Sequence, residues 1–197
     1  LPKKNYKSFN SRTMAEIARD KCLAAGIFDK VIISSDDPFF EDLVNCNEVE
    51  FIKRTEQLAG DNATTDMVID FFFEELPTCE SILWVNSVSP LQSIQDIKKC
   101  GIRLYNPNVD CVMAVNTLYQ HCCLRNKPLN FDPNKAFEKT QDLEPIQRYI
   151  YSCMGWSRET YVKSRMEGFK GLFPGNMSLV EVSKLAGMLI KYEEDFI

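Results

Sequence analysis

The sequence predicts an α/β fold: a Rossmann-like, doubly wound and mostly parallel sheet. Helical and strand patterns alternate along most of the 197 residues, which is typical of successive βαβ units. Short apolar or β-branched runs at 30–35, 48–52, 81–86 and 110–115 predict the strands. The length suits one domain with a small appendage, and 45% hydrophobic with 26% charged residues is ordinary for a globular protein.

Helical spacing and capping residues predict the helices between those strands. Residues 11–25 carry apolar side chains at helical spacing, and Gly26 follows where a left-handed cap is usual. A short helix is expected at 39–45, after a proline that suits a first helical turn. A further helix opens at Thr64 and ends before Pro77. Its expected inward residues are Met67, Val68, Phe71, Phe72 and Leu76.

The second half of the chain holds the expected centre of the sheet and an interruption. The most apolar run, 81–86, is expected to be the central strand, and a capping-box pattern opens a helix from 93 to about 105. From 116 to 139 the periodicity is lost and turn residues dominate. We therefore expect 116–154 to form an insertion that leaves the sheet, with 146–154 returning as an extended segment.

Charge and cysteine usage exclude several classes of protein. A net charge of −5 argues against a nucleic-acid partner, and no apolar run approaches the ~20 residues of a membrane span. No secretory signal pattern is expected. Eight scattered cysteines without a C-x-x-C pair, and a single histidine, argue against a disulfide framework and against a usual zinc site. We expect reduced cysteines, a cytoplasmic location and no membrane partner.

Ligands of doubly wound sheets bind beyond the carboxyl ends of the strands, which directs attention to three loops. Loop 34–38 offers polar groups, although its residues also form an ordinary strand-to-helix turn. Loop 53–65 combines Arg54 with a small-residue turn before a helix N-terminus, which suits an anion or a base edge. Loop 86–92 offers uncharged amides and hydroxyls that suit a sugar or a heterocycle. The candidate substrate residues there are Asn86, Ser89 and Gln92.

The amino terminus adds a basic cluster to an acidic protein. Lys3, Lys4, Asn5 and Lys7 lie within five positions, and clustered lysines suit a polyphosphate. A charged chain end is also commonly just solvated, so composition leaves both interpretations open.

Several motifs occur in one order along nearly the whole chain. They are Leu1-Pro2-Lys3-Lys4-Asn5, the run 25–37, Arg54 with 58–65, Ser89-Pro90-Leu91, Gln141-Asp142-Leu143 and Glu193-Glu194-Asp195-Phe196. In this order and spacing they resemble the acylneuraminate cytidylyltransferases, also called CMP-sialic acid synthetases. Each string alone is weakly specific, whereas the ordered set is fairly specific.

The resemblance implies a Rossmann-like sheet with a protruding dimerisation region, so 1–197 would be one cytidylyltransferase-like domain, 116–154 its protrusion and the protein a homodimer. The implied reaction is attack by the anomeric hydroxyl of an acidic, sialic-like (nonulosonic) sugar on the α-phosphorus of CTP. Pyrophosphate leaves and a CMP-sugar forms. Such a transfer depends on positioning and on neutralising charge. The resemblance also implies Mg²⁺ as cofactor.

The resemblance also assigns roles to individual residues. Lys4 and Asn5 match a Lys-Asn pair at the triphosphate and are the catalytic candidates. Asn86 stands where a sugar-contacting glutamine is usual, and Arg148 matches an arginine for the substrate carboxylate, which a guanidinium suits by its fork geometry. The candidate cytosine and ribose contacts are Arg54, Ala59, Gly60, Asp61, Asn62 and Thr64.

Three departures from the family pattern keep other interpretations open. A first strand and an Arg-x-x-Ser-Lys-Gly loop are not found before the Lys-Asn pair, and losing that strand would leave a hole in the sheet. The Asp-Ile-Asp metal ligands are replaced by Leu189-Ile190-Lys191, and no Asn-Gly follows Arg148. One alternative is therefore a catalytically degenerate homologue that binds nucleotide or assists assembly. Another is a transferase for a different nucleotide or acceptor.

Overall fold

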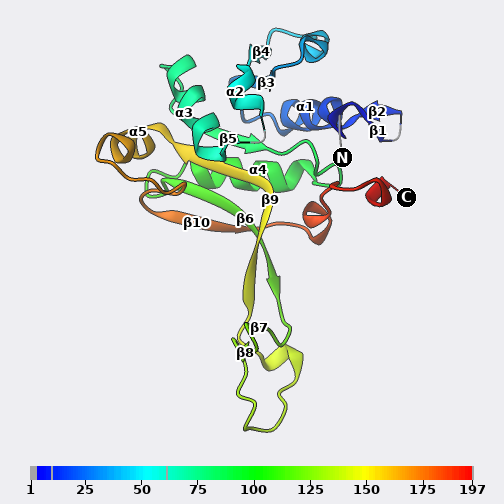
Figure 1. Cartoon of the computed structure of the whole chain (residues 1–197), viewed down its shortest axis with the longest axis vertical. Helices are drawn as coiled ribbons and strands as arrows, with labels where there is room; N and C mark the ends of the chain where they lie inside the picture. The colour runs from blue at the N-terminus through cyan, green and yellow to red at the C-terminus, as the bar shows by residue number, and fades with distance from the viewer. Residues whose placement is uncertain (1–3, 10, 61, 197) are drawn as a thin grey trace.

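The computed structural model describes residues 4–9, 11–60 and 62–196 (Figure 1). The predicted positions Lys3 and Asp61 lie outside these ranges. The main body is a four-stranded sheet of order β10-β6-β9-β5, and a separate parallel pair joins β3 to β4. The bounds are β3 Val31–Ser35, β4 Val49–Lys53, β5 Ser81–Val85, β6 Cys111–Leu118, β9 Ile146–Ser157 and β10 Met177–Glu181.

The predicted α/β class is confirmed, with a sheet that is mixed in direction. Strand β10 runs parallel to β6, whereas β9 runs antiparallel to both β6 and β5. The expectation that 81–86 forms the central strand is wrong for the described residues, because β5 lies at the end of the four-stranded sheet. Helices cover the apolar side chains of β5 on either face, and a cavity lies along the free edge of the strand.

Two long helices begin at capping boxes. Helix α1 (Met14–Ala25) starts at Thr13, whose hydroxyl accepts from the backbone of Glu16, and it ends at Gly26 with a positive φ of 63°. A left-handed residue there costs a glycine little, as the sequence predicted. Helix α4 (Ile94–Leu104) has the predicted capping box at Ser93. The other helical elements are η1 Lys4–Tyr6, η2 Pro38–Leu43, α2 Glu56–Ala59, α3 Thr65–Glu75, η3 Thr140–Asp142, α5 Arg158–Met166, η4 Lys184–Gly187 and η5 Glu193–Phe196.

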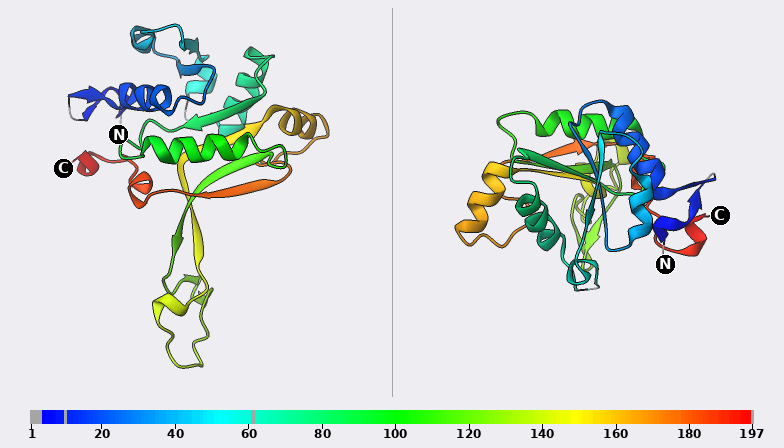
Figure 2. Two further views of the ribbon diagram at one scale, coloured as in Figure 1. Left: turned by 180° about the vertical axis from the view of Figure 1, so that it is seen from behind. Right: turned by 90° about the horizontal axis from the view of Figure 1, so that it is seen from above.

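Helices cover both faces of the four-stranded sheet (Figure 2). Alternate residues of β6 face opposite sides: Val112 packs with α4, whereas Met113 packs with α3 and α5. The buried residues of α3 are Val68, Ile69 and Phe73. The predicted inward set included only the first of them, because the helix is rotated so that its Phe72 face lines the cavity beside β5.

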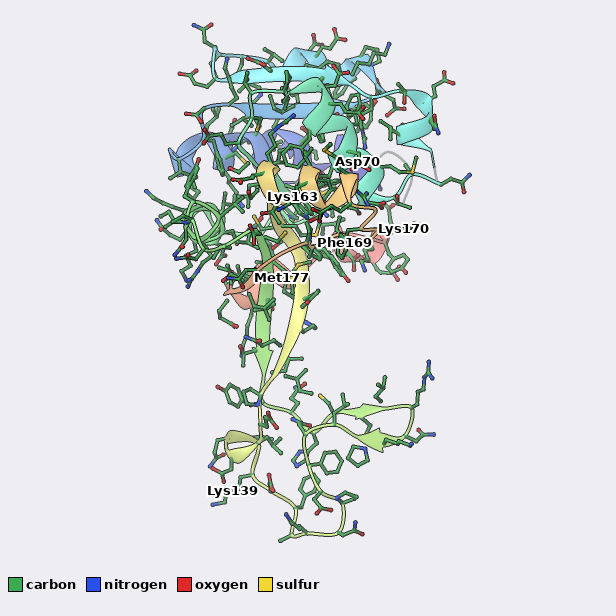
Figure 3. All side chains as sticks on the ribbon, turned by 90° about the vertical axis from the view of Figure 1, so that its left-hand side faces the viewer. Asp70, Lys139, Lys163, Phe169, Lys170 and Met177 are labelled. Atoms are coloured by element: carbon green, nitrogen blue, oxygen red, sulfur yellow. The ribbon has the colours of Figure 1, made fainter. Side chains whose placement is uncertain are left out.

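An arm projects from the sheet (Figure 1). Strands β6 and β9 continue beyond the sheet as a paired ribbon up to Leu118 and Ile146. Beyond it lies a small hairpin of β7 (Cys123–Leu124) and β8 (Lys127–Pro128). Figure 3 shows the arm side chains, including Lys139, standing clear of the body. Within the predicted insertion 116–154, Ile150, Ser152, Cys153 and Met154 are buried in the body of the protein, whereas Tyr151 is exposed.

Two further features bear on the sequence predictions. All eight cysteines are free thiols. Within the described ranges, no helix has the length and apolar character needed to cross a membrane. The two remaining short strands, β1 (Ser8–Phe9) and β2 (Arg12–Thr13), form a hairpin ahead of α1. That hairpin occupies the start of the predicted helix 11–25.

Candidate functional site

Three strand ends converge near the amino-terminal segment. The backbone N–H of Arg54, just after β4, donates to the carbonyl of Ser35 at the end of β3, at 2.9 Å. The hydroxyl of Ser87, just after β5, donates to Oδ1 of Asn5 at 3.0 Å. The carboxyl ends of β3, β4 and β5 therefore meet at one edge, as the sequence predicted for a ligand site. The predicted site residues Asn5 and Arg54 both lie at this edge. The backbone of Lys4 adjoins it in η1.

A cavity of about 940 Å³ opens at this edge. It extends between β3 and β5 along their full length, and its lining is a nearly even mixture of polar and apolar surface. One polar end lies at the carboxyl ends of the strands, whereas Asp29, Lys30 and Glu80 line the opposite end. The polar residues that line the end at the carboxyl ends of the strands are Asn5, Ser34, Ser35, Arg54, Asn86 and Ser87.

Two polar groups at this end of the cavity are buried without a protein partner. They are Nε of Arg54 and Oγ of Ser34. Burial lowers the pKa of the Arg54 guanidinium, and nearby Asp36 opposes that shift. A buried cation and a buried hydroxyl with unused donors are costly unless something accepts from them. Both residues line the cavity at this end.

Buried hydrogen bonds hold the loop after β5 in place. The hydroxyl of Ser89 donates to the carbonyl of Ala186 at 2.6 Å, and Nε2 of Gln92 donates to Oγ of Ser152 at 3.1 Å. Ser89 and Gln92 are only 4% and 1% exposed. Their bonds therefore shape the loop, whereas Asn86 lines the large cavity.

Lys21 of α1 is a second support for that loop, and it carried no signal in the sequence. Its ammonium donates to the carbonyls of Pro90 and Gln92 at 2.5 and 2.6 Å. Burial lowers the pKa of Lys21, and Arg12 adds to the shift, whereas Asp96 opposes it. The helix thus fixes the backbone on which Asn86 is carried.

The turn after β4 contributes less to the edge than the sequence predicted. Arg54 lines the cavity, whereas Ala59, Gly60, Asn62 and Thr64 do not. Gly60 ends α2 in an extended conformation, and Asn62 and Thr64 are exposed. Thr64 starts α3 without a side-chain capping bond to the helix backbone.

Arg148 lies apart from the cavity, on β9. Its Nη2 donates to Oδ1 of Asn116 at 3.4 Å. It is four residues from Ser152 on the same strand, or about 13 Å at the usual rise of 3.3 Å per residue. A Cβ at Gly187 would lie 3.1 Å from the guanidinium, so η4 passes between Arg148 and Ser89.

The carboxylates near the C-terminus are engaged by the protein itself. Oδ2 of Asp195 accepts from the backbone N–H groups of Lys191 and Tyr192 at 2.6 and 2.8 Å, and these bonds lower the pKa of Asp195. Glu193 pairs with Lys7, and the half-buried Leu189 packs against a core cluster. Across the described ranges, no three His, Cys, Asp or Glu side chains are grouped as metal ligands. These residues do not fit the implied Mg²⁺.

Comparison with protein families gives one match to most of the chain. A family model described as Cytidylyltransferase matches residues 1–152. No curated protein matches the chain in sequence.

Solved structures share the fold at low sequence identity. The 4-diphosphocytidyl-2C-methyl-D-erythritol synthase from Anaerococcus prevotii has a TM-score of 0.67 and 13% identity over 98% of this chain and 89% of its own. A CMP:2-keto-3-deoxy-manno-octonic acid synthetase complexed with CTP has a TM-score of 0.63 and 11% identity over 92% and 85%. The 2-C-methyl-D-erythritol 4-phosphate cytidylyltransferase from Francisella tularensis scores 0.59 with 14% identity over 100% and 90%. Structural matches at sequence identities this low show a shared fold alone.

Proposed function

The chain belongs to the cytidylyltransferase family, and from this premise we propose that it transfers CMP from CTP to an acidic, sialic-like sugar with release of pyrophosphate. Family membership supports nucleotidyl transfer, and a structural neighbour complexed with CTP supports that nucleotide. The nonulosonic acceptor rests on the ordered sequence motifs.

The observation that carries the proposal is the pair of unpartnered donors at the polar end of the cavity. A cytosine edge presents two neighbouring acceptors, O2 and N3, and a guanidinium fork donates well to such a pair. Arg54 offers a buried, unpartnered Nε, and Ser34, which lines the same end of the cavity, offers a hydroxyl. We assign the base to these two side chains.

Asn5 is proposed to hold the phosphates beside that base. Its Oδ1 is taken by the hydroxyl of Ser87, so the amide is oriented and its Nδ2 remains as a donor. With the neighbouring Lys4, it would donate to the triphosphate and stabilise charge on the pyrophosphate as it leaves. The sugar hydroxyl attacks the α-phosphorus, the P–O bond to pyrophosphate breaks, and the hydroxyl proton passes to solvent.

The acceptor is proposed to contact Asn86 at the cavity, and its carboxylate is assigned to Arg148 on the ground of the resemblance alone. Asn86 offers an amide at the cavity, supported by the loop that Ser89, Gln92 and Lys21 hold in place. Arg148 is exposed and would bind the sugar carboxylate. The direct test is Arg148→Lys, which should raise KM for the sugar acid and leave CTP affinity unchanged. Arg125, exposed on the arm, gives the matched control Arg125→Lys.

A second copy of the chain is proposed as the partner of the arm. The arm exposes large apolar side chains: Tyr119, Leu124, Leu129 and Phe137, the last at 79%. Apolar groups exposed together on a projecting element favour a contact with another protein surface. A change of Phe137→Ser should shift the mass measured by light scattering from dimer to monomer.

We also propose a cytoplasmic location, because the eight cysteines are free thiols.

A nucleotide-binding module without turnover is the second candidate. It is favoured by Leu189, which packs against the core at a position where the resemblance implies a metal ligand. It is also favoured by Asp195, whose carboxylate accepts from the backbone N–H groups of Lys191 and Tyr192. Calorimetry with CTP and a pyrophosphate-release assay with a panel of nonulosonic acids separate the two. Turnover supports the transferase, whereas CTP binding without product supports the module.

Arg54→Ala is the test variant for the nucleotide site, and Lys53→Ala is its matched control. Arg54→Ala should weaken CTP binding, whereas Lys53→Ala should not, because Lys53 is exposed and does not line the cavity. Competition among CTP, UTP and GTP tests the base. Preference for UTP or GTP would contradict the assignment of Arg54 to cytosine.

A further inference from the structure

A small pocket lies between α1, α4 and loop 86–92, apart from the large cavity. Its volume is about 10 Å³, which is room for a single water molecule. Ile17 of α1 and Ile97 of α4 form part of its wall. We call it the loop pocket. The polar residues that line it are Lys21, Asn86, Ser87, Ser89 and Gln92.

The side chain of Gln92 brings an unused acceptor to the loop pocket. Gln92 is almost completely buried, and its Nε2 donates to Oγ of Ser152 at 3.1 Å. Its Oε1 has no hydrogen-bond partner among the described residues. A buried carbonyl oxygen without a donor is costly, and ordered water is the usual partner of such a group where a pocket adjoins it.

The side chain of Lys21 brings a donor to the same pocket. An ammonium carries three N–H groups. Two of them suffice for the carbonyls of Pro90 and Gln92, which lie 2.5 and 2.6 Å from Nζ. One N–H is left for a further acceptor. Such an acceptor would offset part of the burial that lowers the pKa of Lys21.

The chemistry of the lining selects what the pocket can hold. The ammonium of Lys21 disfavours a second cation, and the carbonyl oxygen of Gln92 disfavours an anion. A dry void needs an apolar lining, whereas half of the residues around this pocket are polar. A neutral molecule of one heavy atom that both donates and accepts fits the volume and the polar groups together.

We propose that one ordered water molecule occupies the loop pocket. It accepts a hydrogen bond from the ammonium of Lys21 and donates one to Oε1 of Gln92. Its second hydrogen is available to Oγ of Ser87, whose own proton goes to Oδ1 of Asn5. A buried water commonly makes about three such bonds. The water thus joins α1, loop 86–92 and the amino-terminal segment in one network.

The first experiment is a crystal structure of the protein at a resolution that shows ordered waters. We expect one density peak in the loop pocket, within about 2.7–3.2 Å of both Nζ of Lys21 and Oε1 of Gln92. A pocket without density, or one filled by a rotated side chain, would overturn the proposal. The proposal does not depend on the nucleotide or sugar assignments, because neither ligand is needed for its tests.

The second experiment counts long-lived internal waters in solution by oxygen-17 magnetic relaxation dispersion. Gln92→Met keeps the length of the side chain and removes the acceptor oxygen, so the count should fall by one relative to wild type. The matched control is Gln95→Met, since Gln95 is exposed on α4 and does not line the pocket. Its count should equal that of wild type.

Two outcomes of the solution experiment would contradict the proposed water. One is an equal count in wild type and Gln92→Met. The other is a loss of the same size in Gln95→Met, because the loss would then not report on the loop pocket. If Gln92→Met does not fold, the crystal structure of the wild type decides alone.

Discussion

Asp96 is the buried carboxylate whose replacement gives the sharpest test of how the site is supported. It is 3% exposed and accepts four hydrogen bonds. Oδ2 accepts from N and Oγ of Ser93 at 3.2 and 2.8 Å, and from Oγ of Ser183 at 2.7 Å, while Oδ1 accepts from N of Ser183 at 2.9 Å. It thereby ties the start of α4 to the segment that leads to Ala186, the partner of Ser89.

The perturbation is Asp96→Asn, which keeps the shape and removes one acceptor oxygen. In either orientation the new amide faces a backbone N–H, of Ser93 or of Ser183, that then has no acceptor. The two hydroxyls can rotate, but that N–H cannot. An unsatisfied buried N–H costs about 1–3 kcal/mol and the loss of charge-assisted bonds adds to it, so we expect the free energy of unfolding to fall by about 2–4 kcal/mol. A domain is stable by only ~5–15 kcal/mol.

The pH dependence separates this mechanism from a simple packing loss. Burial would raise the pKa of Asp96, but the hydrogen bonds from Ser183 and Ser93 outweigh it and hold the pKa below its usual value. A depressed folded pKa gives stability that is present above the unfolded value of ~3.9 and is lost as the pH falls through the folded value. The difference between wild type and Asp96→Asn, measured by urea unfolding, should therefore shrink below about pH 4.

Asp42→Asn is the matched control, since Asp42 is exposed on η2. It should change the unfolding free energy by less than about 0.5 kcal/mol. A loss below about 1 kcal/mol for Asp96→Asn at pH 7, or an equal loss at pH 7 and pH 3, would refute the reasoning.

Three further changes test packing and support of the site. Arg165→Met should lower the unfolding free energy by about 1 kcal/mol, because Arg165 bridges Asp66 and Asp70 at 3.0 and 2.9 Å but those carboxylates are over a third exposed; no loss in urea unfolding would contradict this. Gly155→Ala should cost about 1–3 kcal/mol, since its Cβ would lie 2.7 Å from a leucine methyl carbon; unchanged stability would show that the neighbours give way. Lys21→Met should weaken CTP binding in calorimetry while CTP still saturates the protein, and unchanged affinity would remove its supporting role.

The fold could be predicted from local signals where these act alone. The capping box at Ser93 and the glycine at 26 set helix ends through bonds within a few residues, and both were predicted. The capping box at Thr13 was not predicted, and the helix was expected to begin at 11. The position of β5 in the sheet could not be predicted in this way, because strand order depends on pairing between distant segments. The apolar run 81–86 correctly indicated a strand that is covered on both faces. It did not indicate that this strand lies at the open edge of the four-stranded sheet.

The residues of the candidate site likewise divide into those that local sequence signals predicted and those that depend on distant contacts. Asn5, Arg54 and Asn86 each follow or precede a recognisable element, and the meeting of strand ends brings all three to one cavity. Ser34 was readable only as part of an ordinary turn, since its unpartnered hydroxyl is a property of packing. Lys21 and Asp96 act through contacts 69 to 87 positions away in sequence, to Pro90 and Ser183, and no local pattern reports such pairs.

The residues that line the carboxyl end of the cavity are carried by different strands, and this links ligand binding to the arrangement of those strands. Ser34 lies near the end of β3, Arg54 follows the end of β4, and Asn86 follows the end of β5. A ligand that contacts all three needs β3 and β5 at a fixed separation. Any contact that fixes this separation favours ligand binding, and by linkage the ligand favours the same separation to the same extent.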